Sequence, residues 1–225
     1  MRMRRRARER SARFVAEGED LLAAADAAGW QPLERYCAAG SGLAGVEVEP
    51  KVLSSASGLA SGTRALGVYE ERWADRPRGP LCVFLHGIHD PGNVGAVLRS
   101  AEAFGASCVA LGPGSADPFS PKAVRASMGA VFGVPLARAT RIDELPGLKI
   151  ALVAGAGTEL WQVTERMARS NAKDHAILIG SEREGLPQEV VEQADVTAHI
   201  AIKSHSLNAA MAATIALYEL NRMAR

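Results

Sequence analysis

The sequence predicts an α/β protein whose larger part is a mostly parallel sheet covered by helices. From residue 81 onward, short apolar runs typical of buried strands alternate with segments whose apolar residues recur at helical spacing. Three polar, glycine-bearing stretches each follow one of these runs, as loops do at the carboxyl edge of a parallel sheet. We expect a small α/β domain at 1–72, a charged linker at 73–80 and a larger domain at 81–225.

The first domain is predicted to alternate short strands and helices over about 70 residues, near the lower size for an independent core. Leu21, Leu22 and Ala25 share one helical face, and Gly29 marks the end of that helix. Strands are expected at 14–16, 33–38, 46–48 and 66–69, and helices at 19–28 and 52–59. The linker is charged and carries Pro77 shortly before Pro80, as segments between domains often do.

The second domain has the stronger alternation of strands and helices. Ser120 followed by Pro121 fits a helix N-cap and first turn. Strands are expected at 81–85, 107–111, 133–137, 149–154, 175–180 and 196–202, and helices at 93–104, 121–128, 187–194 and 207–223. Strands that alternate with helices in this way are typical of a parallel sheet, because each helix connects two parallel strands.

Composition indicates a soluble, cytoplasmic protein. Of the 225 residues, 48% are apolar, yet no apolar run reaches the length of a membrane span. The basic N-terminus lacks the apolar segment of a signal peptide. The three cysteines are widely spaced, and two of them lie in apolar runs, so buried free thiols are expected rather than disulfides or metal ligands.

Positive charge is concentrated in an N-terminal arm, residues 1–10. The whole chain has a net charge of +1, whereas the arm holds six arginines and one glutamate. Such a segment suits a polyanion such as a nucleic acid, although a solubilising tail is the simpler alternative. The arginines taken as candidate contacts are Arg4, Arg5, Arg6 and Arg10.

Residues 83–105 combine the end of a strand, a turn and a helix. The apolar run ends at Leu85, a turn rich in Gly, Asp and Pro follows, and helical spacing begins at Asn93. A helix that starts at the carboxyl edge of a sheet directs free N–H groups toward a ligand site there. Asn93 and Arg99 are the polar residues of this unit and are therefore candidate site residues.

Two later stretches, residues 180–186 and 200–208, follow predicted strands in the same way. Parallel strands bring all three stretches to one sheet edge, so they are expected to line one pocket. The phosphate-binding patterns GxxxxGKS/T and GxGxxG are absent from the sequence, and Leu160 occupies the place of a third glycine after Gly155 and Gly157. A nucleotide-binding enzyme of unrelated chemistry is therefore the least favoured alternative.

The three stretches resemble motifs 1, 2 and 3 of the SPOUT methyltransferases, in particular the TrmH (SpoU) family of RNA ribose 2′-O-methyltransferases. The first is DPGNVGAVLRSAEAFG at 90–105, the second is GSEREGL at 180–186, and the third, 200–208, is similar to the pattern I-P-M…SLN. Residues 122–130 are similar to the family's K-x-S-x-G-A segment. The first 70 residues resemble its L30e-like substrate-binding domain.

This resemblance implies a fold, a cofactor and a site. The family fold is an α/β sheet with a C-terminal deep trefoil knot, a rare exception to unknotted chains. The enzymes are homodimers that bind S-adenosyl-L-methionine in the knot and act on ribosomal or transfer RNA, of which rRNA is favoured here. By resemblance, the cofactor is held by Gly180, Ile200, Leu207 and Ala154. By resemblance, the catalytic residues are Arg99, Asn93, Glu182, Ser206 and Asn208.

The implied reaction moves a methyl group from a sulfonium to a ribose 2′-oxygen. Positioning the reactants in line can contribute roughly 7–11 kcal/mol to such a displacement. A guanidinium stays protonated in proteins, so Arg99 is expected to orient the adjacent phosphate and stabilise charge on the oxygen, and the general base stays unassigned. The motifs have no metal-ligand spacing, so no metal is expected.

Motif 3 departs from the family pattern at two positions. Ala201 stands where proline is usual, and Ala210 where a serine is common. These changes make a catalytically silent RNA-binding protein the main alternative function. Catalysis is favoured because Asn93, Arg99 and Glu182 are all present, and a silent binder would not need them together. Housekeeping modification and resistance to a ribosome-directed antibiotic both stay open.

Overall fold

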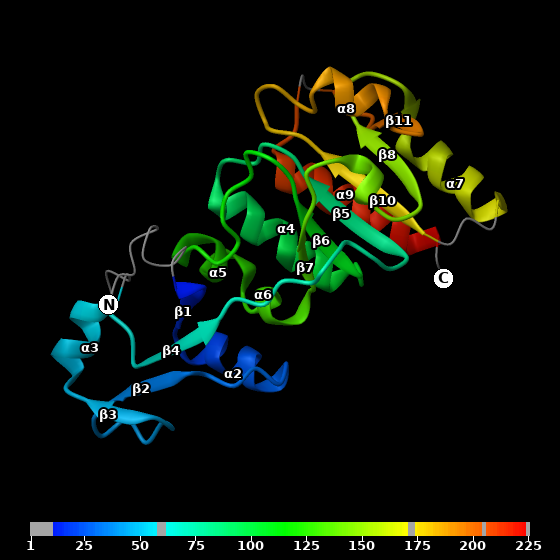
Figure 1. The fold of residues 1–225 in the computed structure, drawn as a ribbon. Helices are drawn as coiled ribbons and strands as arrows, with labels where there is room; N and C mark the ends of the chain where they lie inside the picture. Colours follow the sequence, from blue (N-terminus) through cyan, green and yellow to red (C-terminus); the bar gives the residue numbers. More distant parts are fainter. Residues whose placement is uncertain (1–10, 58–61, 171–173, 204–205, 224–225) are drawn as a thin grey trace.

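The computed structural model describes residues 11–57, 62–170, 174–203 and 206–223, which form two sheets with helices packed against them (Figure 1). The small sheet is built by the first part of the chain and the large sheet by the rest. The basic arm, residues 1–10, lies outside the described residues.

The small sheet is mixed, with strand order β1-β4-β2-β3. Its strands are β1 (Arg13–Glu17), β2 (Glu34–Ala38), β3 (Val46–Val48) and β4 (Ala65–Glu70). β4 runs antiparallel to both β1 and β2, whereas β3 is parallel to β2. Helix α2 (Glu19–Ala27) packs on one face, and α3 (Pro50–Ala56) packs on the other through Leu53. The helix expected at 52–59 therefore begins earlier, with a proline in its first turn.

The large sheet has seven strands, and all its pairings are parallel. The strand order is β7-β6-β5-β10-β8-β11-β9. The strands are β5 (Leu81–Leu85), β6 (Cys108–Leu111), β7 (Leu136–Arg138), β8 (Leu148–Leu152), β9 (Thr158–Glu159), β10 (His175–Ile179) and β11 (Val196–His199). The predicted α/β class with a small sheet before a parallel one is confirmed, whereas the trefoil knot stays an expectation from the resemblance.

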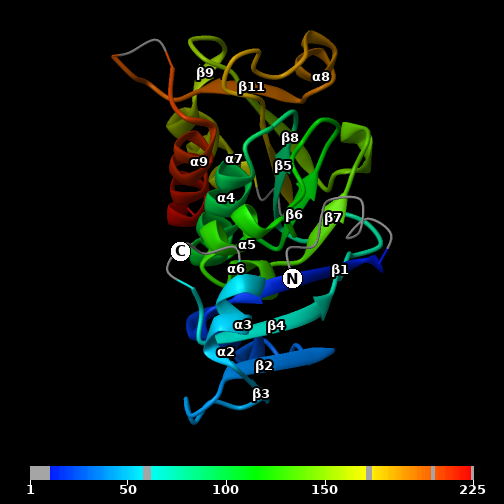
Figure 2. The same ribbon diagram turned by 90° about the vertical axis from the view of Figure 1, so that its left-hand side faces the viewer.

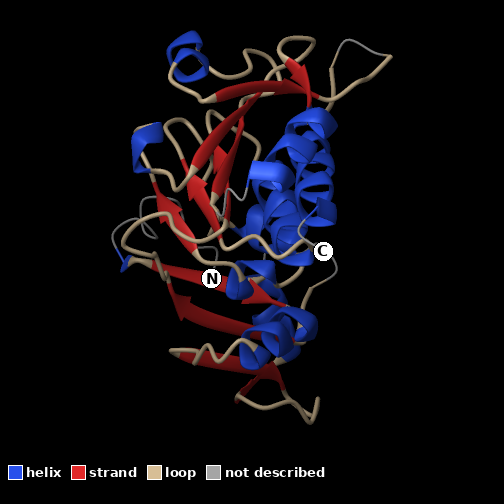
Figure 3. Ribbon diagram, turned by 90° about the vertical axis from the view of Figure 1, so that its right-hand side faces the viewer, coloured by secondary structure: helices blue, strands red, loops and turns tan. Residues whose placement is uncertain are grey.

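Helices cover the two faces of the large sheet unequally, as Figures 2 and 3 show. The helices are α4 (Pro91–Ala103), α5 (Pro121–Ser127), α6 (Ala130–Gly133), α7 (Leu160–Ser170), α8 (Gln188–Glu192) and α9 (Ala209–Met223). Val83 and Leu85 of β5 point to the face covered by α4, α5, α7 and α9. Cys82 and Phe84 point to the other face, which α8 and a short 3-10 helix, Ile142–Glu144, cover.

Several predicted element bounds were wrong. Helix α7 was not predicted, although its buried residues Leu160, Val163, Thr164 and Met167 follow helical spacing. The strand expected at 133–137 occupies 136–138, because 130–133 form α6. The strands expected to reach 154 and 202 end at 152 and 199, and the last helix begins at 209 rather than 207.

The two sheets share one apolar core. The ring centroid of Phe14 on β1 lies 4.8 Å from that of Phe119 and 5.8 Å from that of Phe132, both in the second part of the chain. Trp30 donates from Nε1 to the carbonyl oxygen of Phe132 at 2.9 Å. Truncating a buried aromatic such as Phe14 to alanine is worth roughly 3–5 kcal/mol. The small sheet is therefore joined to the large one by packing as well as by the chain, and the domain bounds at 72 and 81 stay a prediction.

Candidate active site

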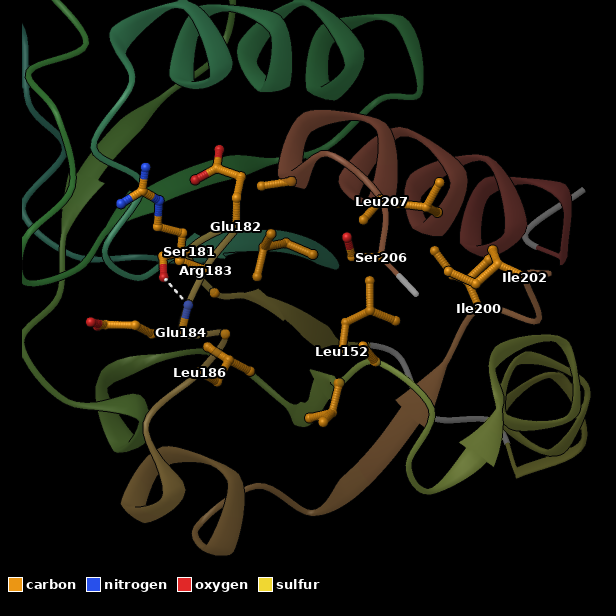
Figure 4. A pocket seen from close by; sticks show the side chains of 17 residues that line it. Leu152, Ser181, Glu182, Arg183, Glu184, Leu186, Ile200, Ile202, Ser206 and Leu207 are labelled. Atoms are coloured by element: carbon orange, nitrogen blue, oxygen red, sulfur yellow. Dashed lines mark hydrogen bonds between the residues drawn. The ribbon is translucent and has the colours of Figure 1, made fainter. Parts of the chain in front are cut away.

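A cavity of about 370 Å³ opens at the carboxyl edge of the large sheet, beyond the ends of β8 and β10 (Figure 4). Its walls are the three segments that follow β8, β10 and β11, together with the start of α9. The lining residues are Leu152–Ala154, Ile179–Leu186, Ile200, Ile202, Ser206, Leu207, Ala209 and Ala212. This volume lies within the range of roughly 300–1,000 Å³ that is typical of ligand pockets.

The loop at 180–186 is closed on itself by backbone hydrogen bonds. Ser181 and Gly185 exchange N–H···O bonds of 3.1 and 3.0 Å, and the N–H of Glu184 donates to Ser181 Oγ at 3.1 Å. The loop passes so close to its own start that a Cβ on Gly180 would lie 2.1 Å from the carbonyl carbon of Gly185. The wall of the cavity is therefore a fixed backbone surface rather than a set of mobile side chains.

A chain of side-chain hydrogen bonds connects the three predicted motifs. Asn93 on α4 donates from Nδ2 to Glu182 Oε1, and Asn208 donates from Nδ2 to Asn93 Oδ1 at 3.1 Å. The other amide atom of Asn208 caps α9, because its Oδ1 accepts from the N–H groups of Ala210 at 2.9 Å and Met211 at 3.3 Å. The amide orientations are thereby fixed, and Glu182 is held at the edge of the cavity.

Helix α4 is clamped between α5 and α9. A Cβ on Gly95 would lie 2.4 Å from the carbonyl oxygen of Ala123 on α5, so only glycine allows this approach. On the other side, Ser100 Oγ lies 2.6 Å from Thr214 Oγ1 of α9. The start of α4 is capped by Asp90, which also accepts from Lys122 Nζ at 2.7 Å. The bond from Lys122, together with the N–H of Gly92, lowers the pKa of the Asp90 carboxyl, so the cap stays charged.

The cavity brings together most of the residues predicted from the sequence. The four residues expected to hold the cofactor, Gly180, Ile200, Leu207 and Ala154, all line it. Glu182 and Ser206 line it as well, and Asn93 and Asn208 adjoin it through Glu182. Neither departure from the family pattern, Ala201 or Ala210, is among the described lining residues.

Arg99 lies elsewhere. It follows Asn93 by six residues, or about 9 Å along the helix axis, and its side chain is exposed on the outer face of α4. Its guanidinium has no hydrogen-bond or ion-pair partner within the described part of the chain. The structure therefore brings Asn93, Glu182, Ser206 and Asn208 together but leaves Arg99 outside the cavity of its own chain.

Several lining residues were not predicted from the sequence. Arg183 and Glu184 flank the expected Glu182, and Figure 4 shows Glu182 and Arg183 directed to the same side of the loop. Ala212 stands one turn after Asn208 in the last helix, a spacing that the sequence already contained. Nothing in the sequence pattern marked Ile202.

His86 supports the same sheet edge from the opposite face. It follows β5, its backbone N–H donates to the carbonyl oxygen of Ile179 at 2.9 Å, and its ring lies 6.0 Å from that of Phe84. Burial lowers the pKa of the His86 imidazole, although the carboxylate of Glu189 opposes that shift. The imidazole is thus favoured in its neutral form and adds no positive charge beneath the loop at 180–186.

Comparison with known proteins identifies the family. The model of the SpoU rRNA Methylase family matches residues 80–218, which is more than half of the chain. The chain belongs to this family. The family predicted from the three motifs is therefore confirmed, and the match contains all three of them.

Relatives of this SpoU-family chain include proteins named as RNA methyltransferases. It is 31% identical over 140 residues to the 23S rRNA (guanosine(2553)-2′-O)-methyltransferase RlmP of Bacillus subtilis, an alignment that covers 61% of this chain and 56% of that protein. The chain thus spans little more than half of that relative's length. Among solved structures, the AdoMet-bound rRNA methyltransferase from Sinorhizobium meliloti is 30% identical, with a TM-score of 0.84 over 98% of this chain and 91% of that one.

A structure described as an RNA 2′-O ribose methyltransferase is 27% identical, with a TM-score of 0.80 over 99% of this chain and 93% of the other. These full-length likenesses include the small sheet as well as the large one. None of the described helices is both long and apolar enough to cross a membrane. The described residues also contain no group of three or more His, Cys, Asp or Glu placed to hold a metal ion.

Proposed function

We propose that this SpoU-family protein transfers the methyl group of S-adenosyl-L-methionine to a ribose 2′-oxygen of RNA, with rRNA favoured over tRNA. The observation that carries the proposal is the hydrogen-bond chain from Asn208 through Asn93 to Glu182. It joins three separate loops at the edge of one cavity, as a site that positions two reactants requires. The names of the Bacillus and Sinorhizobium relatives support the same reaction and an rRNA substrate.

The cavity fits the proposed cofactor. Backbone of Gly180 and apolar side chains such as Ile200 and Leu207 form the walls, with Ala154 at the end of the adjacent loop. Gly180 lacks the Cβ that would fill part of the fold behind the loop. These four residues would hold S-adenosyl-L-methionine, which when bound supplies an activated methyl group on a positively charged sulfur.

The polar residues at the cavity edge would position the ribose. Asn93 holds the carboxylate of Glu182, and Asn208 holds Asn93, so the three side chains cannot turn independently. Glu182 can accept a hydrogen bond from the 2′-hydroxyl and so fix the direction of its oxygen lone pair. Arg99 is permanently charged and would bind the neighbouring phosphate and stabilise negative charge on the attacking oxygen.

Transfer of labelled methyl groups tests this proposal. Calorimetry with S-adenosyl-L-methionine should show binding, and ribosomal RNA lacking its native methyl groups should accept label at positions that resist alkaline cleavage. Resistance to alkali marks the 2′-oxygen, because a methylated oxygen cannot attack the adjacent phosphodiester. RNA binding without transfer would instead support the silent RNA-binding protein, and absence of cofactor binding would refute both the cofactor and the reaction.

The basic arm would add affinity for RNA without sequence preference. We propose that Arg4, Arg5, Arg6 and Arg10 contact phosphates, which fits action on RNA in the cytoplasm. Deleting residues 1–10 should weaken RNA binding and flatten its salt dependence, by about 0.9 in the log–log slope for each lost contact on duplex RNA or slightly less on single strands. Binding isotherms at several salt concentrations measure that slope. A slope unchanged by the deletion would leave the arm as a solubilising tail.

An apolar stripe on α9 supports a homodimer. Met211, Ile215 and Tyr218 recur at helical spacing and are 62%, 36% and 51% exposed. The ring of Tyr218 lies 6.0 Å from that of Phe104 at the end of α4, so the stripe continues onto the neighbouring helix. A second copy that covers this stripe would also approach the outer face of α4, where Arg99 is exposed. We infer that the dimer places the Arg99 of one copy at the cavity of the other.

The double variant Met211→Glu/Tyr218→Glu should be monomeric, because two buried carboxylates cannot be tolerated in an apolar interface. Methyl transfer should fall by at least about tenfold, whereas thermal stability of the monomer should change little, since both side chains are exposed. Sedimentation velocity and the transfer assay measure the two effects. Val46→Glu is the control, because Val46 is equally exposed, at 62%, on the far strand of the small sheet. A dimeric double variant would reject this interface.

A further inference from the structure

A second cavity, of about 240 Å³, lies where the small sheet meets the large one. One wall is the segment that leaves β4, and the other is the segment from α6 to β7, which adjoin between the two sheets (Figure 1). The lining residues are Trp30, Arg72, Trp73, Ala74 and Val131–Leu136. None of these described lining residues is acidic. The cavity is separate from the proposed active site, which lies over β8, β10 and β11.

Two arginines are stacked on the tryptophans of this seam. The guanidinium carbon of Arg72 lies 4.2 Å from the ring centroid of Trp30, and that of Arg138 lies 4.3 Å from the ring centroid of Trp73. Both arginines are exposed, and within the described part of the chain neither guanidinium has an ion-pair partner. Each therefore keeps its charge and its outward planar face available to a ligand.

The tryptophans are held in place from behind. Trp30 is only 7% exposed and donates from Nε1 to the carbonyl oxygen of Phe132 at 2.9 Å. The Trp73 ring packs edge-on against Phe119 at 5.3 Å, and its Nε1 donates to Glu71 at 3.1 Å. The flat surfaces are thus preorganised, so a ligand that stacks there pays little ordering entropy.

We propose that this seam binds one unpaired nucleotide of the RNA substrate, a proposal that rests on the proposed function. Planar guanidinium and aromatic faces are the surfaces on which proteins stack unpaired bases, and the two positive charges complement the flanking phosphates. The cavity is smaller than the pockets that enclose whole cofactors, which suits a single base. A double-stranded RNA keeps its bases stacked within the helix and cannot fill it.

The bound nucleotide is a different one from the methylated nucleotide. The seam borders β7 at one edge of the large sheet, and β6 and β5 separate that strand from β10. Three strand spacings of about 4.8 Å place the two sites roughly 14 Å apart across the sheet. A nucleotide held at the seam would therefore set which neighbouring ribose reaches the active site, and so contribute to the choice of substrate.

Variants that remove the two stacked charges test the proposal. Arg72→Gln/Arg138→Gln should weaken binding of a single-stranded RNA oligonucleotide by roughly tenfold, as expected for the loss of one stacked base. Affinity for S-adenosyl-L-methionine should be unchanged. Arg141→Gln is the matched control, because Arg141 is exposed close by but is paired with Asp143. Fluorescence anisotropy measures RNA affinity, and thermal unfolding checks that each variant folds.

Tryptophan fluorescence provides a second measurement. The chain has three tryptophans, so in a Trp161→Phe background only Trp30 and Trp73 emit. A single-stranded oligonucleotide should quench this emission, and the same strand annealed to its complement should quench it much less. Unchanged RNA affinity in the double variant together with no quenching would overturn the proposal, even if methyl transfer is observed. Tenfold weaker binding together with quenching would support the seam even if the transfer assay fails.

Discussion

Replacing Arg99 with alanine is expected to abolish methyl transfer while leaving affinity for S-adenosyl-L-methionine within a few-fold of the wild type. The side chain is exposed on α4 and does not line the cavity of its own chain, so cofactor contacts survive its loss. Removing a preorganised group that stabilises developing charge typically costs roughly 10²–10³ in kcat. Single-turnover methyl transfer and calorimetry measure the two quantities separately.

Mixing two inactive variants distinguishes action within one chain from action across the dimer. If Arg99 serves the partner's cavity, a mixed dimer of Arg99→Ala and Glu182→Ala contains one complete site, formed by the Glu182 of the first copy and the Arg99 of the second. Random exchange makes half of the dimers mixed, so about a quarter of wild-type activity should return. If Arg99 serves its own cavity, no mixed dimer contains a complete site, and activity stays absent.

An exposed arginine of another helix provides the control. Arg166 on α7 is also exposed, and the described residues offer it no ion-pair partner, so Arg166→Ala removes a similar charge from a similar helical position. Its transfer rate should stay within about twofold of the wild type. Normal turnover by Arg99→Ala would contradict the catalytic role, and an equal loss in Arg166→Ala would show that the assay responds to overall charge.

The sequence was most informative about the loops at the sheet edge. Residues 180–186 could be placed there because the apolar run before them is a buried strand, and all parallel strands end at the same edge. The position of Arg99 could not be deduced in this way. A motif gives residue identity, whereas the direction of a side chain six residues into a helix depends on which faces α5 and α9 cover.

The seam between the sheets was also hidden from sequence reasoning. Phe14, Trp30 and Phe132 are far apart in the chain, and their packing is a property of the folded molecule. Trp73 stands within a segment whose charge and prolines indicated only a linker, yet it packs on Phe119. Periodicity can identify the buried face of one element, but it carries no information about which two faces meet.

Gly180→Ala is expected to abolish binding of S-adenosyl-L-methionine. The added Cβ would lie 2.1 Å from the carbonyl carbon of Gly185 and 2.2 Å from the backbone nitrogen of Leu186. Both atoms are backbone, so no rotation of a side chain can relieve the overlap. The paired hydrogen bonds between Ser181 and Gly185 must open instead, and this moves the wall that the cofactor is proposed to contact. Calorimetry should show affinity reduced by at least about 100-fold, or about 2.7 kcal/mol.

Gly185→Ala separates this steric effect from backbone strain. Gly185 has φ of 69°, which an alanine adopts at a cost of roughly 1–2 kcal/mol, but its added Cβ would meet nothing within 4 Å. This variant should therefore lose some thermal stability and keep cofactor affinity within a few-fold. Gly180→Ala should show the reverse pattern, with the larger effect on binding. Wild-type affinity in Gly180→Ala would mean that the cofactor does not depend on this loop, because the substitution cannot leave the loop in place.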